Sequence, residues 1–273
     1  MLVRPNGIGE LLGDVLITGK PFQSTGDVWF VNSNGGQDGA APAGKDREKP
    51  LASLAQAITS AAAGDIIVLM TNHTETLTGP LSVNKAVVIV GAGLSGGLPT
   101  VTLKINSAAN DLLDVSAAAA ELHNILFPAS VQSNVGGGGG SKIFVNAAQF
   151  RCVGCYFQCS GNDQMSALGL GTGANNARIV NTTFISTATA VATRPRGGLE
   201  ITAAISDLEM DGVTFSDGTV GFAQSAMLAT AAAITRLRGQ NISQLLGADI
   251  QLHASTVGWL NIQTATGGGR LSW

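Results

Sequence analysis

The sequence predicts an all-β chain folded as a parallel β-helix, a solenoid in which each coil stacks on the previous one. The first observation is a repeated eight-residue pattern whose closing residues lie 30, 27, 31 and 27 positions apart. The second is that apolar and polar residues alternate within each copy, which is strand spacing. The third is a Gly or Asn at the fifth position, where a corner with positive φ is expected. This period, without 3.6-residue spacing, indicates coils of short strands.

The repeated pattern is apolar, charged, apolar, any residue, Gly or Asn, two further residues, and finally Phe or Ile. Its copies are 120–127, 150–157, 177–184, 208–215 and, less strictly, 235–242. The third position should face the core, and it is occupied by Leu122, Cys152, Ile179, Met210 and Leu237. A further strand is expected before each copy, at Leu112–Val115, Ile143–Val145, Leu168–Leu170, Leu199–Ile201 and Met227–Leu228. The repeat therefore predicts two or three strands per coil.

The elements before the repeat are expected in the following order. Residues 1–26 form an N-terminal arm, and the solenoid occupies 27–265. The arm contains apolar residues that need a partner, either another subunit or the end of its own solenoid: Leu11, Leu12, Val15, Leu16 and Ile17. After a strand at 27–32, Pro50 is expected to open a short capping helix over about 50–62. A buried strand follows at 66–70. Residues 266–273 form a C-terminal tail in which Trp273 is a candidate anchor.

The stretch from Trp29 to Gly39, together with Lys49–Leu54 and Gly64–Val68, resembles the entry of pectate-lyase-like, single-stranded right-handed β-helix proteins. The resemblance implies a right-handed coil whose N-terminal end is plugged by the helix. It covers about residues 27–105 by motif and the remainder by the repeat. The superfamily includes lyases, hydrolases, phage tailspikes and capsid decorations, so the resemblance specifies the fold and leaves the function open.

A glycine-rich segment, Gly91-Ala-Gly93-Leu-Ser-Gly96, has the glycine spacing of the dinucleotide-binding fingerprint. That chemistry needs a helix opening at the glycines. Pro99 and a strand pattern over 101–105 follow instead, so the segment is interpreted as a turn and no cofactor is expected. Two projecting loops are expected, at 130–141 and at 188–198. The second contains Arg194 and Arg196, which are candidates for an interface with an acidic neighbour.

The amino-acid composition excludes some classes of function. Charged residues make up 12 % of the chain and hydrophobic residues 45 %, whereas ordinary globular domains carry about 25 % charged residues. The low charge suggests that much of the outer face packs against copies of the chain or a larger assembly. A net charge of −3 offers no basic face for nucleic acid. No apolar run approaches a membrane span, and the first residues lack signal-peptide features, so cytosolic synthesis is expected.

Candidate chemistry is sparse. Cys152, Cys155 and Cys159 cluster without a fourth ligand, so Cys152 is interpreted as a small core residue and no metal site is expected. The carboxylates considered for glycan cleavage are Asp111, Asp114, Glu121, Asp163, Glu200, Asp207, Glu209, Asp211 and Asp217. Asp207, Glu209 and Asp211 alternate and form the best acidic cluster, as a hydrolase or calcium site. A ladder of Glu121, Arg151, Arg178, Glu209 and Arg236 is expected on one face, as a solvated or packing stripe.

These observations lead us to expect a structural protein of a bacteriophage virion that is not an enzyme. It would be a capsid decoration, or cement, protein on the capsid surface, assembled in the host cytoplasm. A homotrimer bound to the major capsid protein between capsomers would suit the symmetry of such a lattice. The alternative is a phage tailspike or depolymerase that binds or cleaves bacterial surface polysaccharide. In that case Asp207, Glu209 and Asp211 would be the catalytic residues.

Overall fold

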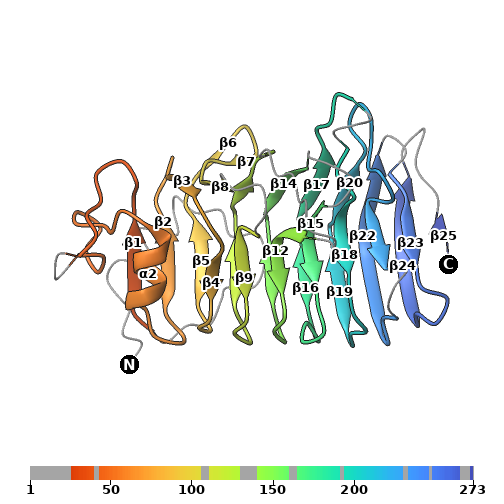
Figure 1. Cartoon of the computed structure of the whole chain (residues 1–273), viewed down its shortest axis with the longest axis horizontal. Coiled ribbons are helices and arrows are strands. Elements are labelled where there is room, and N and C mark those ends of the chain that lie inside the picture. The colour runs from red at the N-terminus through yellow and green to blue at the C-terminus, as the bar shows by residue number, and fades with distance from the viewer. Residues whose placement is uncertain are drawn as a thin grey trace.

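The chain winds into a right-handed parallel β-helix whose coils stack along the long axis (Figure 1). The computed structural model describes residues 26–39, 43–105, 111–129, 140–159, 165–190, 194–229, 233–245, 248–264 and 271–272. Strands of successive coils pair in parallel throughout the described part of the chain, and β1 and β25 lie at opposite ends of the stack. The prediction of an all-β solenoid with one short N-terminal helix is confirmed.

The strands form three faces, called A, B and C below. Face A contains β1 (Val28–Val31), β2 (Ile66–Leu69), β5 (Val88–Gly91), β10 (Glu121–His123), β13 (Arg151–Val153), β16 (Arg178–Val180) and β19 (Leu208–Asp211). Face B contains β3 (Thr74–Leu77), β8 (Thr102–Ile105), β11 (Leu126–Phe127), β14 (Tyr156–Cys159), β17 (Thr183–Ser186) and β20 (Thr214–Ser216). Face C contains β4 (Leu81–Val83), β9 (Leu113–Val115), β12 (Gly140–Val145), β15 (Met165–Leu170), β18 (Gly197–Ile201), β21 (Met227–Ala229), β23 (Ile250–Leu252) and β25 (Leu271–Ser272). All the strands that were expected before the repeat copies are present on face C.

Faces A and B join in the last coils. The long strand β22 (Leu237–Leu245) pairs with both β19 and β20, and β24 (Gly258–Thr264) pairs along it. The register of β22 and β24 shifts between Gly239 and Ile242, where the chain turns from face A to face B.

The glycine-rich segment forms a hairpin. Strands β6 (Leu94–Ser95) and β7 (Leu98–Pro99) pair antiparallel around Gly96 and Gly97, whose φ angles are 59° and 84°. Two consecutive positive φ angles are typical of a two-residue type I′ turn, which favours glycine. Strand β8 follows, as expected, so the interpretation of this segment as a turn between strands is confirmed.

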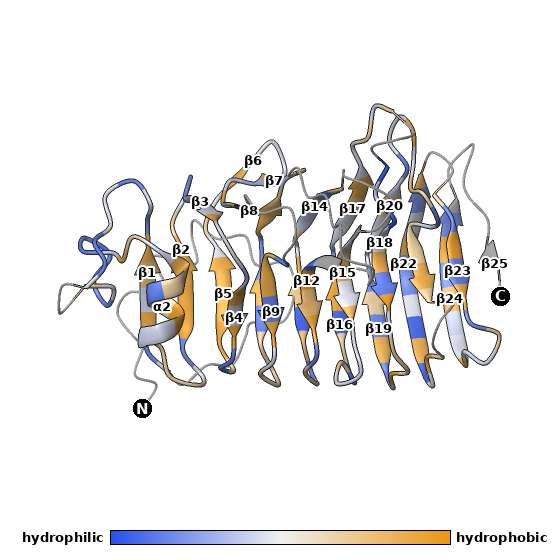
Figure 2. Ribbon diagram, in the orientation of Figure 1, coloured by the Kyte–Doolittle hydropathy of each residue, from blue (hydrophilic) through white to orange (hydrophobic). Residues whose placement is uncertain are grey.

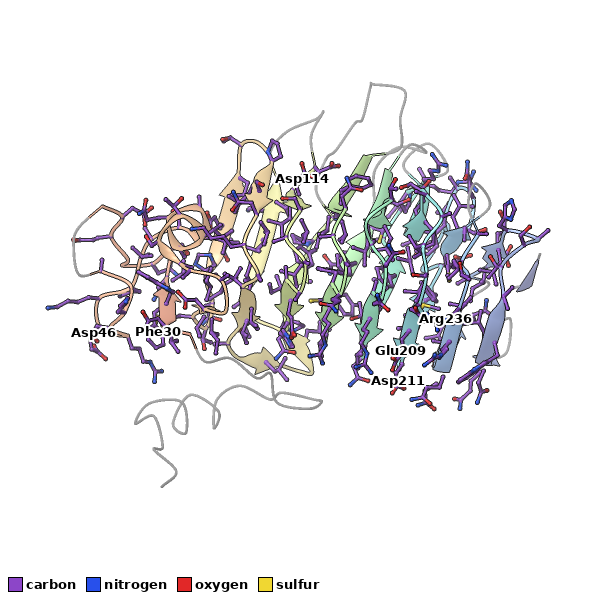
Figure 3. All side chains as sticks on the ribbon, turned by 90° about the horizontal axis from the view of Figure 1, so that it is seen from below. Phe30, Asp46, Asp114, Glu209, Asp211 and Arg236 are labelled. Atoms are coloured by element: carbon purple, nitrogen blue, oxygen red, sulfur yellow. The ribbon has the colours of Figure 1, made fainter. Side chains whose placement is uncertain are left out.

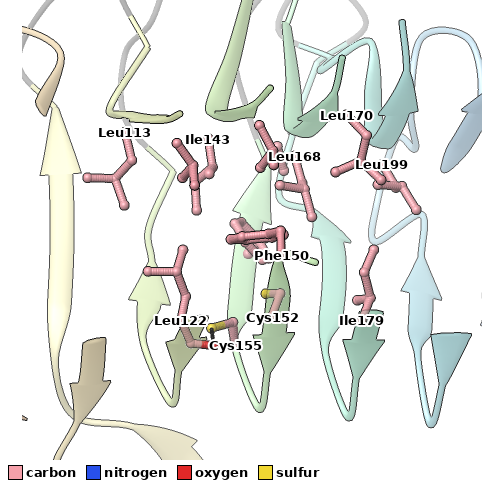
Figure 4. Packing of buried hydrophobic residues seen from close by; sticks show 14 of the residues in the cluster. Leu113, Leu122, Ile143, Phe150, Cys152, Cys155, Leu168, Leu170, Ile179 and Leu199 are labelled. Atoms are coloured by element: carbon pink, nitrogen blue, oxygen red, sulfur yellow. Dashed lines mark hydrogen bonds between the residues drawn. The ribbon is translucent and has the colours of Figure 1, made fainter. Parts of the chain in front are cut away.

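The core is a set of columns that run along the solenoid axis (Figure 4). Leu122, Cys152 and Ile179 stack in register and are at most 1 % exposed, and Met210 continues the column. The closing Phe residues of four repeat copies form another column, with ring centroids 4.7, 4.9 and 5.4 Å apart from Phe127 to Phe215. These spacings match the distance of about 4.8 Å between neighbouring strands. Each coil therefore buries its side chains against the next.

The fifth position of the pattern forms the corner after each face A strand. Asn124, Gly154, Asn181 and Gly212 have φ between 45° and 64°. The side-chain oxygen of Asn181 lies 2.3 Å from where a Cβ on Gly212 would be. A side chain at Gly212 would force the Asn181 amide to move, so glycine is favoured above asparagine at this corner, and the same relation holds for Asn124 and Gly154.

The fifth repeat copy is shifted from its expected register. Leu237 pairs with Leu208, and Gly239 pairs with Met210, so Leu237 does not occupy the predicted third position. The corner in this coil is at Asn241, with φ of 52°, two residues later than expected. Gln244 then takes the column position after Phe215 and is 1 % exposed. This copy matches the repeat pattern less strictly than the others, so its register was predicted two residues away from the observed one.

The capping helix α2 (Leu54–Ser60) is shorter than the expected 50–62, and Pro50 does not open it. Leu51 instead pairs with Val31 of β1, and its amide donates to the Phe30 carbonyl at 2.8 Å. Ser53 is the N-cap, and its hydroxyl accepts from the Gln56 amide. Within the described residues, no helix is long and apolar enough to cross a membrane.

The C-terminal end of α2 is held by a lysine from the next coil. The Lys85 ammonium donates to the carbonyls of Ile58, Thr59 and Ala61 at 2.8, 2.8 and 2.6 Å. A cation is favourable at this negative end of the helix dipole. Buried Leu54, Ala57 and Ile58 close the N-terminal end of the core, as the expected plug should.

The phenylalanine column supplies a stability test. Phe184 is fully buried between two rings, so Phe184→Ala should lower the free energy of unfolding by about 3–5 kcal/mol, measured by urea unfolding. Leu98→Ala at the tip of the hairpin, where the side chain is 41 % exposed, is the control and should cost under about 1 kcal/mol. Equal losses in the two variants would contradict the stacked core.

Candidate functional site

A row of outward-pointing side chains runs along face A. In register order it contains Val88, Glu121, Arg151, Arg178, Glu209, Arg238 and Trp259. The predicted ladder is therefore present from Glu121 to Glu209, with one correction. Arg238, rather than Arg236, follows Glu209, because the fifth copy is shifted by two residues.

The last coils of this row form an open hollow of about 360 Å³, lined by Asn176, Arg178, Asp207, Leu208, Glu209, Arg236 and Arg238. Two ion pairs line it. The Arg178 guanidinium lies 2.6 Å from the Glu209 carboxylate, and Arg236 pairs with Asp207. Among the described residues, no carboxylate forms an ion pair with Arg238, so its charge is available to a ligand.

The predicted acidic cluster is only partly assembled. Figure 3 shows Glu209, Asp211 and Arg236 together on one side of the solenoid, far along the axis from Phe30. Asp207 and Glu209 line the hollow, but Asp211 accepts hydrogen bonds from Gln240 and Asn241 at 2.7 and 2.8 Å. The three carboxylates therefore have different partners and do not converge on one point.

Asp207 has a positive φ of 56°, a value that a functional residue can hold under strain. The equivalent residues of earlier coils, Ala119, Gln149 and Asn176, have φ between 59° and 61°. The backbone at Asp207 is thus a repeated corner of the fold. Its conformation provides no separate evidence for catalysis.

Glu121 marks the other end of the charged row. It lies 2.8 Å from the His123 imidazole and 3.0 Å from the Arg151 guanidinium. Burial acts to raise the pKa of Glu121, but the hydrogen bond with His123 and the charge of Arg151 outweigh it and lower that pKa. This group is half-buried, unlike the open hollow near Arg238.

The remaining candidate carboxylates lie elsewhere. Glu200 on face C is 4 % exposed and accepts from the Ser166 hydroxyl at 2.7 Å. Arg196 pairs with this same Glu200 at 2.8 Å, so at least one of the two loop arginines has its acidic partner within the chain. Asp114 points outward from face C. The described candidates thus do not form one cleft.

Several predicted site residues are outside the described ranges. They are Leu11, Leu12, Val15, Leu16, Ile17, Asp163 and Trp273, together with most of the glycine loop at 130–139. Arg194 is described and partly buried. The roles proposed for these residues as interface candidates remain predictions.

All three cysteines are buried. Burial raises the pKa of the Cys152 thiol well above its usual range, and the neighbouring Cys155 adds to this effect. The interpretation of Cys152 as a small core residue is confirmed. Across the part of the chain that the structure describes, no three His, Cys, Asp or Glu side chains gather as a metal ion would require.

The sequence did not single out Arg238 or Asn176 for this site, and it offered Trp259 only as one of the few aromatic residues available to a sugar-binding cleft. Their grouping depends on the register of β22 and β24, which the loose fifth copy obscured. The arrangement offers guanidinium donors for carboxylate or hydroxyl oxygens and an aromatic ring beside them. Those are the groups that bind sugars.

Comparisons with known proteins address the fold. No protein-family model and no curated protein matches the chain. A solved structure similar to it is that of the pectin methylesterase from Aspergillus niger, at 12 % sequence identity and a TM-score of 0.46, over 91 % of this chain and 88 % of that one. The similarity concerns the β-helix fold.

This comparison corrects one expectation. The sequence led us to expect a protein that is not an enzyme, but the similar solved structure is itself an enzyme, named for its action on pectin. The expected absence of activity is therefore withdrawn.

Asp217 and Asp249 are neighbouring carboxylates outside the hollow, and the pKa of Asp217 allows a test by pH. Burial, together with the nearby charge of Asp249, raises the pKa of Asp217 to about 6. A carboxyl whose pKa is raised in the folded state binds its proton more tightly there than in the unfolded chain. Stability should therefore fall as pH rises from about 4 to about 6.

Asp217→Asn removes this titration, so its melting temperature should exceed that of the wild type at pH 7.5. The difference should shrink or reverse at pH 4, as measured by thermal unfolding at both pH values. Asp114→Asn, at an exposed strand position, is the matched control. A pH-independent difference between Asp217→Asn and the wild type would contradict the assignment.

Proposed function

We propose that the protein acts on polysaccharide, and that it binds a bacterial surface polysaccharide along face A. The observation that carries this proposal is the hollow around Arg238, which continues in register into Trp259. It matches the alternative suggested by the sequence, a phage tailspike or depolymerase. The name of the similar solved structure, an enzyme of pectin, agrees with this class of ligand.

Trp259 is 52 % exposed, which is unusual for a large aromatic side chain. A sugar ring presents an apolar C–H face to such a ring, while its hydroxyl or carboxylate groups take hydrogen bonds. Arg238 is the register partner of Trp259 on the neighbouring strand, about 4.8 Å away. Side chains from successive coils can therefore contact successive units of a chain that runs along the solenoid axis.

Asp207 and Glu209 are the carboxylates inside the hollow, so they are the candidates for acid, base or nucleophile in a cleavage reaction. Each is paired with a guanidinium, from Arg236 and Arg178 respectively. A ligand that bears carboxylates would compete for these guanidiniums. Binding of the ligand and activation of the two carboxylates would then be coupled.

The binding proposal predicts that Arg238→Ala and Trp259→Ala each weaken affinity about tenfold or more. A lost charge-assisted hydrogen bond is worth about 1.5–3 kcal/mol, and tenfold in affinity corresponds to about 1.4 kcal/mol. The measurement is titration calorimetry against purified capsular and other surface polysaccharides. Arg47→Ala, at an exposed loop arginine far from the hollow, is the matched control and should bind like the wild type.

The same preparations test for chemistry. New reducing ends, an unsaturated product or released methanol would each report a different reaction, and Asp207→Ala with Glu209→Ala should abolish whichever is found. Binding unaffected by Arg238→Ala and Trp259→Ala, or no binding to any saccharide, would overturn the proposed function.

A second candidate is the capsid decoration protein expected from the sequence. The observation that favours it is the low fraction of charged residues, 12 % of the chain. Ordinary globular domains carry about 25 %, so the low charge suits a protein that works by burial between subunits. As a homotrimer on the capsid surface, the protein would contact the major capsid protein after assembly in the host cytoplasm.

This candidate predicts a trimer in analytical ultracentrifugation and co-sedimentation with capsids that lack the protein. Higher ionic strength should not release it, because apolar burial is not screened by salt. A stable monomer without affinity for capsids would remove it. Release at moderate salt would assign binding to charged groups instead.

A further inference from the structure

The outer side of face A is apolar and buried at its N-terminal end. Ile67 and Ile89 point into the core, so their neighbours in the alternation point outward. Those neighbours are Ile66, Val68, Val88 and Val90, and they are only 2–8 % exposed. They form a hydrophobic cluster separate from the core, and Figure 2 shows β2 and β5 almost entirely in hydrophobic colours.

The outward-facing residues of face A change from apolar to charged along the solenoid axis. After Val88 the row continues with Glu121 and Arg151, and farther along Arg178 and Arg238 are exposed. A solvated sheet face of this kind is expected to be polar. The apolar coils therefore require a second layer that the charged coils do not.

Within the described part of the chain, the hydrophobic side chains that pack against this cluster are Val28 and Phe30. Both belong to β1, where they are register partners of Ile66 and Val68. They extend the same layer of the sheet and do not cover it. Low exposure extends along the second outward row to His123 and Val153, at 2 and 4 %, so the covered area runs from β1 to β13.

We propose that this surface is the docking site for the N-terminal segment of the same chain, with the apolar residues between Leu11 and Ile17 as its second layer. The segment enters the described structure next to Asp27, at the start of β1 and so at the edge of the cluster. Nine residues lie between Ile17 and Asp27, so the ten residue steps can span about 33 Å when fully extended. The strands from β1 to β13 span about 19 Å, so the reach is sufficient.

Docking of the N-terminal segment would also limit access to the charged row. Glu121, bound by His123 and Arg151, would form the polar border where the covered surface ends. A ligand on face A would then have access from Arg178 onward and not to the earlier coils. This inference does not depend on the proposed function, because the docking site exists whether or not a ligand binds.

The test is photo-cross-linking of the full chain with p-benzoylphenylalanine in place of Phe30, a half-buried aromatic position on the cluster. Equal amounts of unlabelled and ¹⁵N-labelled protein are mixed before irradiation, and cross-linked peptides are identified by mass spectrometry. We expect cross-links to peptides within residues 1–25 of the same, unmixed isotope. The same probe at Leu98, on the hairpin, is the control and should yield none of these peptides.

Cross-links that join the two isotopes would overturn the proposal in favour of a second copy. Cross-links only to peptides outside 1–25, such as those of the neighbouring strand β2, or no cross-links at all, would overturn it as well. If the Phe30 variant does not fold, Val28 carries the probe instead. Leu12→Asp with Leu16→Asp should lower the cross-link yield several-fold, whereas Thr18→Asp in the same segment should not.

Discussion

Stacking in register is the constraint on which the rest of the structure depends. No single coil can bury its own side chains, so each inward position must meet the same kind of side chain at a spacing of about 4.8 Å. The phenylalanine column from Phe127 to Phe215 meets this requirement, with ring centroids at 4.7, 4.9 and 5.4 Å. The corners follow from it, because the side chain of Asn181 reaches the space where Gly212 would carry a Cβ and so favours glycine there. Helix α2, fixed by Ser53 and Lys85, closes one end of this stack.

This constraint explains why so much of the fold could be predicted from the sequence. Residues that must stack in register must also recur in the sequence, so Leu122, Cys152, Ile179 and Met210 could be assigned to one column from the sequence alone. Where stacking is looser, the prediction failed. The fifth copy has no aromatic closing residue, and Gln244 occupies the column position that was assigned to Ile242. The helix was predicted too long because Pro50 is compatible with a first helical turn, whereas the next residue, Leu51, pairs with Val31 of β1.

The candidate site could be predicted only in part, because outward positions are not bound by the stacking rule. The sequence indicated a charged row but placed Arg236 in it, and the two-residue offset of β22 hid Arg238 and its neighbour Trp259. The alternation of Asp207, Glu209 and Asp211 suggested one acidic cluster. In the fold, each carboxylate takes its own partner from a neighbouring coil, namely Arg236, Arg178 and the pair Gln240 and Asn241. Alternation within a strand therefore says less about a site than the pairing between strands.

Face A combines an apolar, covered section over its first coils with an open, charged section over its last coils, and we propose that the second section binds the ligand. The most direct test is a crystal structure of the protein soaked with an oligosaccharide from whichever polysaccharide binds best. We expect sugar density along face A, with a ring against Trp259 and an oxygen on Arg238. Density confined to face B or face C, with the hollow around Arg238 empty, would contradict it.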